Sequence, residues 1–141
     1  MNSTHDIGLT HVALVTTDPD RSVAFYEKFA GMRVVHRRVD AETHRTVVWL
    51  SDQTRPFVIV LIETDELSTS LRPFAHLGVG CRNREEVDHL CREAVNEDCL
   101  LSGPTDSGYP VGYWAFLTDP DGNTLELSYG QEIALTVSES R

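Results

Sequence analysis

The amino-acid sequence repeats one pattern of residues about 65 positions apart, and this repeat limits the possible folds more than any other feature. His11 opens the apolar stretch HVALV and His76 opens the stretch HLGVG, a difference of 65 positions. Asp18 and Asn83, two residue types favoured at helix starts, differ by the same number. In both copies, strand-like segments follow the helical pattern. We therefore expect two modules of one topology.

The first module is expected over residues 8–63. A strand over 9–16 precedes a helix that begins after Asp18, continues to Ala30 and has Val23, Tyr26 and Ala30 as its inner stripe. Three strands follow, over 33–39, 45–50 and 57–62. A polar linker over 64–74 has no pattern that requires structure of its own. The module order is therefore βαβββ.

The second module is expected over residues 75–130, with the same βαβββ order. After a strand over 75–81, Asn83 and Glu86 have capping-box spacing, and a helical stripe follows at Val87, Leu90, Cys91, Ala94 and Val95. Strands are predicted over 100–102, 113–117 and 124–129, with a loop over 103–112. The tail over 131–141 has no usable signal. We predict a single α+β domain over 1–141, whose sheet curves around a cavity.

Composition narrows the possible partners. Twelve basic and 22 acidic residues give a net charge of −10, which disfavours nucleic acid and anionic membranes. The N-terminus has no basic flank followed by an apolar segment, so we expect a cytoplasmic protein. Its three cysteines have no CxxC spacing, and we interpret them as small buried apolar side chains rather than a metal or disulfide framework.

Three side chains are candidate metal ligands: His11, His76 and Glu126. In the strand TLELSY, Glu126 lies on the face opposite Leu125 and Leu127, so it points to a cavity or to water. His76 shares its strand face with Gly78 and Gly80, which leave room for a ligand. The position that corresponds to Glu126 in the first module is Val60, which is apolar.

Two imidazoles and one carboxylate suit a divalent first-row metal ion and leave coordination positions open. A divalent ion with one carboxylate has a net charge of about +1, which favours anionic, oxygen-rich substrates. Together the three residues point to a metal site, although each taken alone is equally compatible with a hydrogen-bonded structural histidine or a solvated glutamate.

The segments LTHVALVTTDPDRSVAFYEKFAGMRVV, FAHLGVG and FLTDPDGNTLEL resemble the vicinal oxygen chelate superfamily. This superfamily includes glyoxalase I, extradiol dioxygenases, fosfomycin-modifying transferases and bleomycin-binding proteins. The resemblance implies paired βαβββ modules and matches His11, His76 and Glu126 to the family's metal ligands. It also implies a small-molecule substrate, and we expect a homodimer because the fold exposes sheet edges.

The resemblance leaves several reactions open. A His-His-Glu set without a fourth ligand at Val60 resembles extradiol dioxygenases, so Fe²⁺ and ring-cleaving oxygenase chemistry are favoured, with Mn²⁺, Ni²⁺ or Zn²⁺ as other candidates. Those enzymes have a catalytic tyrosine where this chain has Phe116, and Tyr109 and Tyr113 are weak substitutes. A glyoxalase-like lyase or isomerase is the first alternative. A metal-free, bleomycin-resistance-like binding protein is the second.

Several other residues are candidates for contact with the substrate. Trp49 and Trp114 lie 65 positions apart and either line the cavity, with Val60, or fill the core. In a binding protein they would be stacking walls. His36 and His44 flank the basic hairpin RRVDAETHR and could reach a substrate, but we interpret them as structural.

Overall fold

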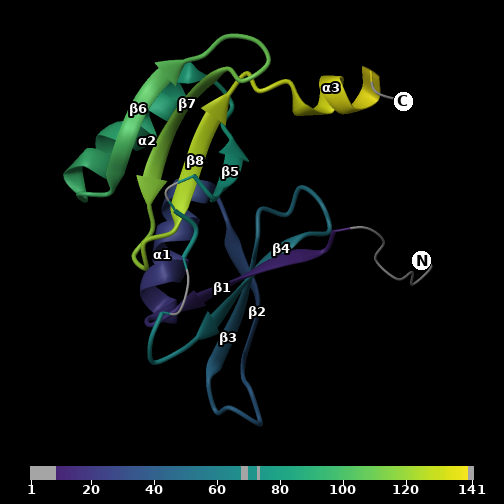
Figure 1. Ribbon diagram of the computed structural model, residues 1–141. Coiled ribbons are helices and arrows are strands. Elements are labelled where there is room, and N and C mark those ends of the chain that lie inside the picture. The colour runs from purple at the N-terminus through teal and green to yellow at the C-terminus, as the bar shows by residue number, and fades with distance from the viewer. Residues whose placement is uncertain (1–8, 68–69, 73, 140–141) are drawn as a thin grey trace. The chain divides into compact units, whose positions relative to one another are not determined.

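The computed structural model describes residues 9–67, 70–72 and 74–139. It contains two compact units, Met1–Ser70 and Leu71–Arg141, which correspond to the two predicted modules. Parts of the predicted linker, 68–69 and 73, lie outside the described residues. Each unit is an α+β structure with one four-stranded mixed sheet (Figure 1).

Unit 1 has the predicted βαβββ order. Its elements are β1 (His11–Thr16), α1 (Pro19–Ala30), β2 (Arg33–Val39), β3 (Thr46–Ser51) and β4 (Val58–Glu63). The strand order across the sheet is β1-β4-β3-β2, so the first and last strands of the module are neighbours. These two strands run parallel, and the other pairs are antiparallel.

Unit 2 repeats this topology. Its elements are β5 (His76–Gly80), α2 (Arg84–Asn96), β6 (Leu100–Asp106), β7 (Tyr113–Thr118), β8 (Thr124–Tyr129) and α3 (Ile133–Glu139). The strand order is β5-β8-β7-β6, with β5 and β8 parallel. The α+β class and the repeated βαβββ order are therefore confirmed.

The core of unit 1 lies between α1 and one face of its sheet. Asp18 caps the helix as predicted, because its carboxylate accepts a hydrogen bond from the Arg21 amide at 3.2 Å. The buried stripe contains Ser22, Phe25, Tyr26, Phe29 and Ala30. Val23 is only half-buried, so its place in the predicted stripe was wrong, because it lies roughly 90° from the stripe centre at 100° per residue.

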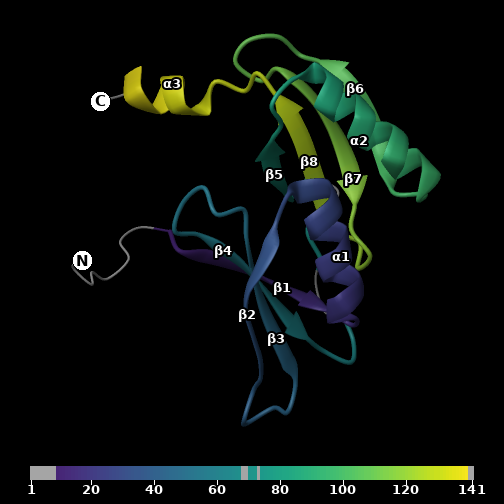
Figure 2. The ribbon, with the colours of Figure 1, turned by 180° about the vertical axis from the view of Figure 1, so that it is seen from behind.

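In unit 2 the helix α2 lies across one face of the sheet (Figure 2). Asn83 is its N-cap, since its side-chain oxygen accepts a hydrogen bond from the Glu86 amide at 2.8 Å. Val87, Cys91 and Ala94 are buried, whereas Val95 is 58% exposed and was wrongly included in the stripe. Val95 lies roughly 70° from the stripe centre, near the helix end.

One strand boundary and one helix of unit 2 also differ from prediction. β6 continues to Asp106, although residues 103–106 were predicted as loop from Gly103 and Pro104. The strand accommodates these residues through irregular pairing with β7 between Ser102 and Thr105. The helix α3 was not predicted.

Among the described residues, no helix is long and apolar enough to cross a membrane.

The turn before β8 is held by buried polar side chains. Asp119 accepts hydrogen bonds from the Asn123 amide at 2.8 Å and from the Asn123 side-chain nitrogen at 2.9 Å. The side-chain oxygen of Asn123 accepts a hydrogen bond from the Leu71 amide at 2.8 Å, and the Thr124 amide donates to the Leu71 carbonyl at 2.7 Å. This network fixes the point where β8 begins, two residues before Glu126.

We predict that Asn123→Ala lowers the free energy of unfolding by about 2 kcal/mol, because it removes the bonded partner of the Leu71 amide and of a buried Asp119 oxygen. Asn96→Ala is the matched control, since Asn96 is exposed at the end of α2 and should change stability by less than about 0.5 kcal/mol. Urea unfolding followed by circular dichroism measures both. Equal losses in the two variants would contradict this account of the turn.

Candidate metal centre

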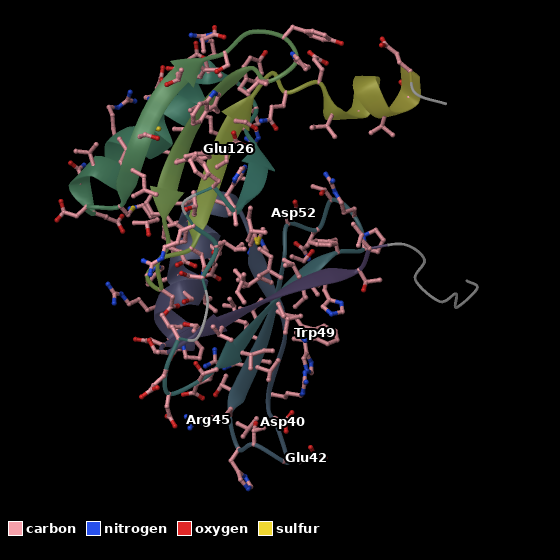
Figure 3. All side chains as sticks on the ribbon, in the orientation of Figure 1. Asp40, Glu42, Arg45, Trp49, Asp52 and Glu126 are labelled. Atoms are coloured by element: carbon pink, nitrogen blue, oxygen red, sulfur yellow. The ribbon has the colours of Figure 1, made fainter. Side chains whose placement is uncertain are left out.

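The open face of the unit 2 sheet, opposite α2, holds the predicted ligands of this unit. In the parallel register, Gly78 of β5 lies opposite Glu126 of β8, and Phe116 of β7 lies opposite Glu126 on its other side. The two apolar neighbours of Glu126 in β8, Leu125 and Leu127, are fully buried. Figure 3 shows Glu126 on β8.

His76 and Glu126 lie close enough to bind one ion. The His76 Nε2 atom is 3.7 Å from Glu126 Oε1. His76 Nδ1 lies 2.5 Å from the Phe74 carbonyl, so Nδ1 is the protonated donor in the neutral ring and Nε2 keeps its lone pair. A metal–nitrogen and a metal–oxygen bond together span about 4.2 Å. One ion between the two atoms would therefore reach both.

Glu126 is buried but has room beside its carboxylate. The sequence predicted that Glu126 faces either a cavity or water. The residue is only 8% exposed, so it lies in a largely enclosed position rather than in open solvent. A Cβ atom added at Gly78 would lie 3.4 Å from Glu126 Oε1, whereas one at Gly80 would meet nothing within 4 Å. The absent Gly78 side chain leaves the carboxylate edge open.

Gln131 is a site residue that sequence reasoning missed. Its side-chain nitrogen donates a hydrogen bond to Glu126 Oε1 at 3.2 Å. The residue lies just after β8, where Gly130 has a φ of +84° and turns the chain. Strand periodicity ends at such a turn, so the pattern of the sequence gave no signal for this contact. The amide restrains the carboxylate oxygen nearest His76.

Aromatic rings border the histidine. The rings of His76 and Phe116 have centroids 5.0 Å apart, and those of Phe116 and Trp114 are 4.8 Å apart. The Trp114 Nε1 atom donates to Ser107 Oγ at 2.8 Å, which orients the indole. Trp114 therefore lies on the open face with His76 rather than in the core between sheet and helix.

The two tyrosine candidates lie elsewhere in unit 2. Tyr113 points to the helix-covered side, where its hydroxyl donates to Asp88 and its ring lies 3.9 Å from the Arg84 guanidinium carbon. The Asp88 carboxylate raises the pKa of Tyr113. Tyr109 is 70% exposed in the loop between β6 and β7. Neither hydroxyl contacts the His76–Glu126 pair.

His11, the third predicted ligand, lies in unit 1 at the start of β1. Its Nδ1 atom is 2.9 Å from Thr10 Oγ1. Ala13, two residues further along β1, is on the same face as His11. In the register Ala13 lies opposite Val60 of β4, and Val60 lies opposite Trp49 of β3, so His11 shares the open face of its sheet with Val60 and Trp49. Val60 matches Glu126 in the repeat and is half-buried. Unit 1 therefore presents an imidazole and an apolar surface, but no carboxylate at this position.

Within the described part of the chain, no group of three His, Cys, Asp or Glu side chains is gathered as a complete metal site. Unit 2 contributes two donors of the type that divalent first-row ions prefer, with an unprotonated nitrogen and a carboxylate at suitable separation. These two residues fit a metal ion as part of a larger ligand set. The participation of His11 stays a prediction.

Comparison with known proteins identifies the family. Residues 8–127 match the family model of the Glyoxalase/Bleomycin resistance protein/Dioxygenase superfamily. The chain belongs to this superfamily. The paired βαβββ units are consistent with the superfamily fold.

Individual superfamily members support the assignment. Uncharacterized protein PA2024 from Pseudomonas aeruginosa is 40% identical over 128 residues, which cover 89% of this chain and 90% of that protein. Lactoylglutathione lyase from Escherichia coli O157:H7 is 28% identical, over 84% of this chain and 90% of the lyase. A solved structure of mutant fosfomycin resistance protein FosX from Listeria monocytogenes, complexed with Mn(II) and 1S,2S-dihydroxypropylphosphonic acid, has a TM-score of 0.72 at 18% identity, with 94% and 99% of the two chains covered.

Two of the three cysteines of this superfamily member, Cys81 and Cys91, have raised thiol pKa values. Burial, followed by the charge of Glu86, raises the pKa of the Cys81 thiol to about 11. Burial, followed by the charge of Asp88, raises the pKa of Cys91 to about 11 as well. Cys91 packs in the core of unit 2 with Val87. The interpretation of the cysteines as buried apolar side chains is therefore confirmed for Cys91, whereas Cys81 and Cys99 are only half-buried.

We predict slow modification of Cys81 and Cys91 by Ellman's reagent in the native Cys99→Ser variant. At pH 8 their thiolate fraction is on the order of one in a thousand, and the rate should rise about tenfold per pH unit up to pH 10 while the fold persists. Absorbance of the released thionitrobenzoate measures the rate. The same variant in guanidinium should react at once, and equally fast native labelling would contradict the raised pKa values.

Proposed function

We propose that this protein is a divalent-metal-dependent enzyme acting on a small substrate with two neighbouring oxygen atoms. The observation that carries the proposal is the 3.7 Å approach of His76 Nε2 to Glu126 Oε1 on the open face of unit 2. The ligand set proposed is His11, His76 and Glu126. The partners proposed are a small-molecule substrate and a second copy of the chain, because each unit leaves two strands at its sheet edges.

The charge of the pair supports a metal rather than a purely structural role. Glu126 is buried. In the described part of unit 2, its carboxylate makes polar side-chain contacts with the His76 imidazole and the Gln131 amide. A buried carboxylate is costly unless it is paired with a positive charge or bound to a metal. A divalent ion would compensate this charge.

The residues around the pair would define how substrate binds. When bound, the ion supplies Lewis-acid polarisation of two substrate oxygens. His76 and Glu126 would hold the ion, and the Gln131 amide restrains the Glu126 carboxylate. The absence of side chains at Gly78 and Gly80 leaves space on the same face. Phe116 and Trp114 would exclude water and pack against the apolar part of the substrate.

A glyoxalase-like lyase or isomerase reaction is the finer assignment we favour. The sequence relative from Escherichia coli is named lactoylglutathione lyase, and it aligns over 84% of this chain. Phe116, which has no hydroxyl, packs on His76 where extradiol dioxygenases are expected to carry a catalytic tyrosine. The Tyr113 hydroxyl is engaged by Asp88 on the other side of the sheet.

An extradiol dioxygenase with Fe²⁺ is the second candidate. The observation in its favour is the apolar Val60, which leaves a His-His-Glu set without a fourth protein ligand at the repeat-related position. Such a set leaves positions for a bidentate substrate and for oxygen. The identity of the bound metal separates the two reactions.

We expect anaerobically purified wild-type protein to contain close to one divalent metal ion per chain, measured by inductively coupled plasma mass spectrometry. Glu126→Gln and His11→Ala should each lower the metal affinity about tenfold or more, because each removes one proposed ligand. Nickel or zinc with lactoylglutathione turnover would support the lyase. Iron with oxygen uptake on catechols would support the dioxygenase. No metal after reconstitution would contradict the enzyme proposal and favour a binding protein.

We also predict that Gly78→Ala lowers metal affinity several-fold, because the added methyl group would lie 3.4 Å from Glu126 Oε1 and narrow the space for an ion. Gly80→Ala is the matched control in the same strand and on the same face, since its methyl group meets nothing within 4 Å. Isothermal titration with Mn²⁺ compares the two variants. Equal affinities would show that the ion does not lie beside Gly78.

A further inference from the structure

The open face of unit 1 carries a group of cationic and aromatic side chains that the proposed metal centre does not use. His36 and Arg38 on β2 lie on the same face as Trp49 on β3, because His36 is opposite Trp49 and Arg38 is opposite Val47 in the register. We call His36, Arg38 and Trp49 the cation–indole cluster. Figure 3 shows Trp49 on the unit 1 sheet.

Trp49 is unusual for its strand. Its neighbours in β3, Val48 and Leu50, are completely buried under α1, whereas Trp49 is 37% exposed on the opposite face. The His36 ring centroid is 4.7 Å from the indole centroid, and the Arg38 guanidinium carbon is 6.0 Å from it. The indole is therefore a partly exposed apolar surface bordered by a cationic group and by an imidazole.

Arg38 lies beside an aromatic ring, whereas three other arginines form ion pairs with carboxylates. Arg37 pairs with Asp20, Arg45 with Asp65 and Arg84 with Asp106. The guanidinium of Arg38 instead lies toward the Trp49 ring.

The acidic residue nearest in sequence does not bind Arg38 directly. Asp40 Oδ1 accepts hydrogen bonds from the amides of Glu42 and Thr43, which hold the pKa of Asp40 below its usual value and fix the turn after β2. The charge of Arg38 also lowers the pKa of Asp40, but by less than the two backbone hydrogen bonds do.

We propose that the cation–indole cluster binds a small ligand with an anionic group, with Trp49 packing against a flat apolar part next to that group. This goes beyond the proposed function and rests on unit 1 alone. A cationic site is notable in a chain of net charge −10, which otherwise repels anions. Guanidinium groups suit carboxylate, phosphate and phosphonate groups.

The register also places this cluster at a distance from the proposed metal ligand of unit 1. His11 lies on β1, two strands away from Trp49 and on the same face of the sheet. Strand spacing makes this separation on the order of 10 Å. An anionic group bound at the cluster would thus lie away from His11 on the unit 1 sheet. An apolar or cationic ligand would have no group for Arg38 to bind.

The test uses phenylphosphonate, which combines an aromatic ring and an anion, and the full-length chain with Trp114→Phe. This background leaves Trp49 as the sole tryptophan, so its fluorescence reports binding at the cluster. We expect a saturable change in Trp49 fluorescence, and a dissociation constant about tenfold higher for Arg38→Gln. Benzyl alcohol, which lacks the charge, should bind at least about tenfold more weakly than phenylphosphonate.

Arg37→Gln is the matched control. Arg37 and Arg38 are adjacent in β2, and both substitutions remove one positive charge, but Arg37 points to the opposite face and pairs with Asp20. Arg37→Gln should change the dissociation constant less than twofold, and Arg38→Lys should retain most of the binding. Equal weakening by Arg37→Gln and Arg38→Gln would overturn the proposal, as would equal binding of benzyl alcohol or the absence of saturation.

Titration in the presence of EDTA separates this proposal from that of the metal enzyme. Phenylphosphonate binding that persists in EDTA and is lost in Arg38→Gln supports the cluster, even if the metal assay is negative. Binding that disappears in EDTA would place the anion on a metal ion and overturn the role of Arg38. Thermal unfolding of Arg38→Gln and Arg38→Lys establishes that both variants are folded.

Discussion

Hydrogen bonds between β5 and β8 run in a parallel register that sets Gly78 opposite Glu126 and His76 opposite Thr124. A shift by one residue would turn Glu126 toward α2 and bury its charge in the apolar core. The register is protected from such a shift by the alternation of Leu125 and Leu127, which must remain under α2. The position of the candidate metal centre therefore depends on core packing on the opposite side of the same strand.

The two units use one topology for different chemistry. The pair Ala13 and Val60 in unit 1 occupies the positions that Gly78 and Glu126 occupy in unit 2, so only unit 2 has a carboxylate and an open backbone there. Unit 1 instead carries cationic and aromatic side chains at the far side of its open face. The buried carboxylate of unit 2 and the cationic and aromatic side chains of unit 1 thus lie on two sheets of the same topology.

Sequence alone predicted most elements, because capping residues and hydrophobic periods act locally. It predicted less well where long-range pairing decides the structure: β6 continues through Gly103 and Pro104 because β7 pairs with it. Val95 was misplaced for a local reason, since it lies roughly 70° from the centre of the buried stripe of α2. Parity correctly placed His76 and Glu126 on one face of the sheet. The Gln131 contact depends on a backbone turn, which no periodicity records.

Duplication with unequal side chains has a consequence for how such a protein can evolve. In unit 2, His76, Gly78 and Glu126 are mutually constrained by close contact, so changes there have little tolerance. In unit 1, the cation–indole cluster lies near the edge strand β2, where side chains can be exchanged without disturbing a buried core. Side chains of unit 1 can then change while the geometry of the His76–Glu126 pair in unit 2 is kept.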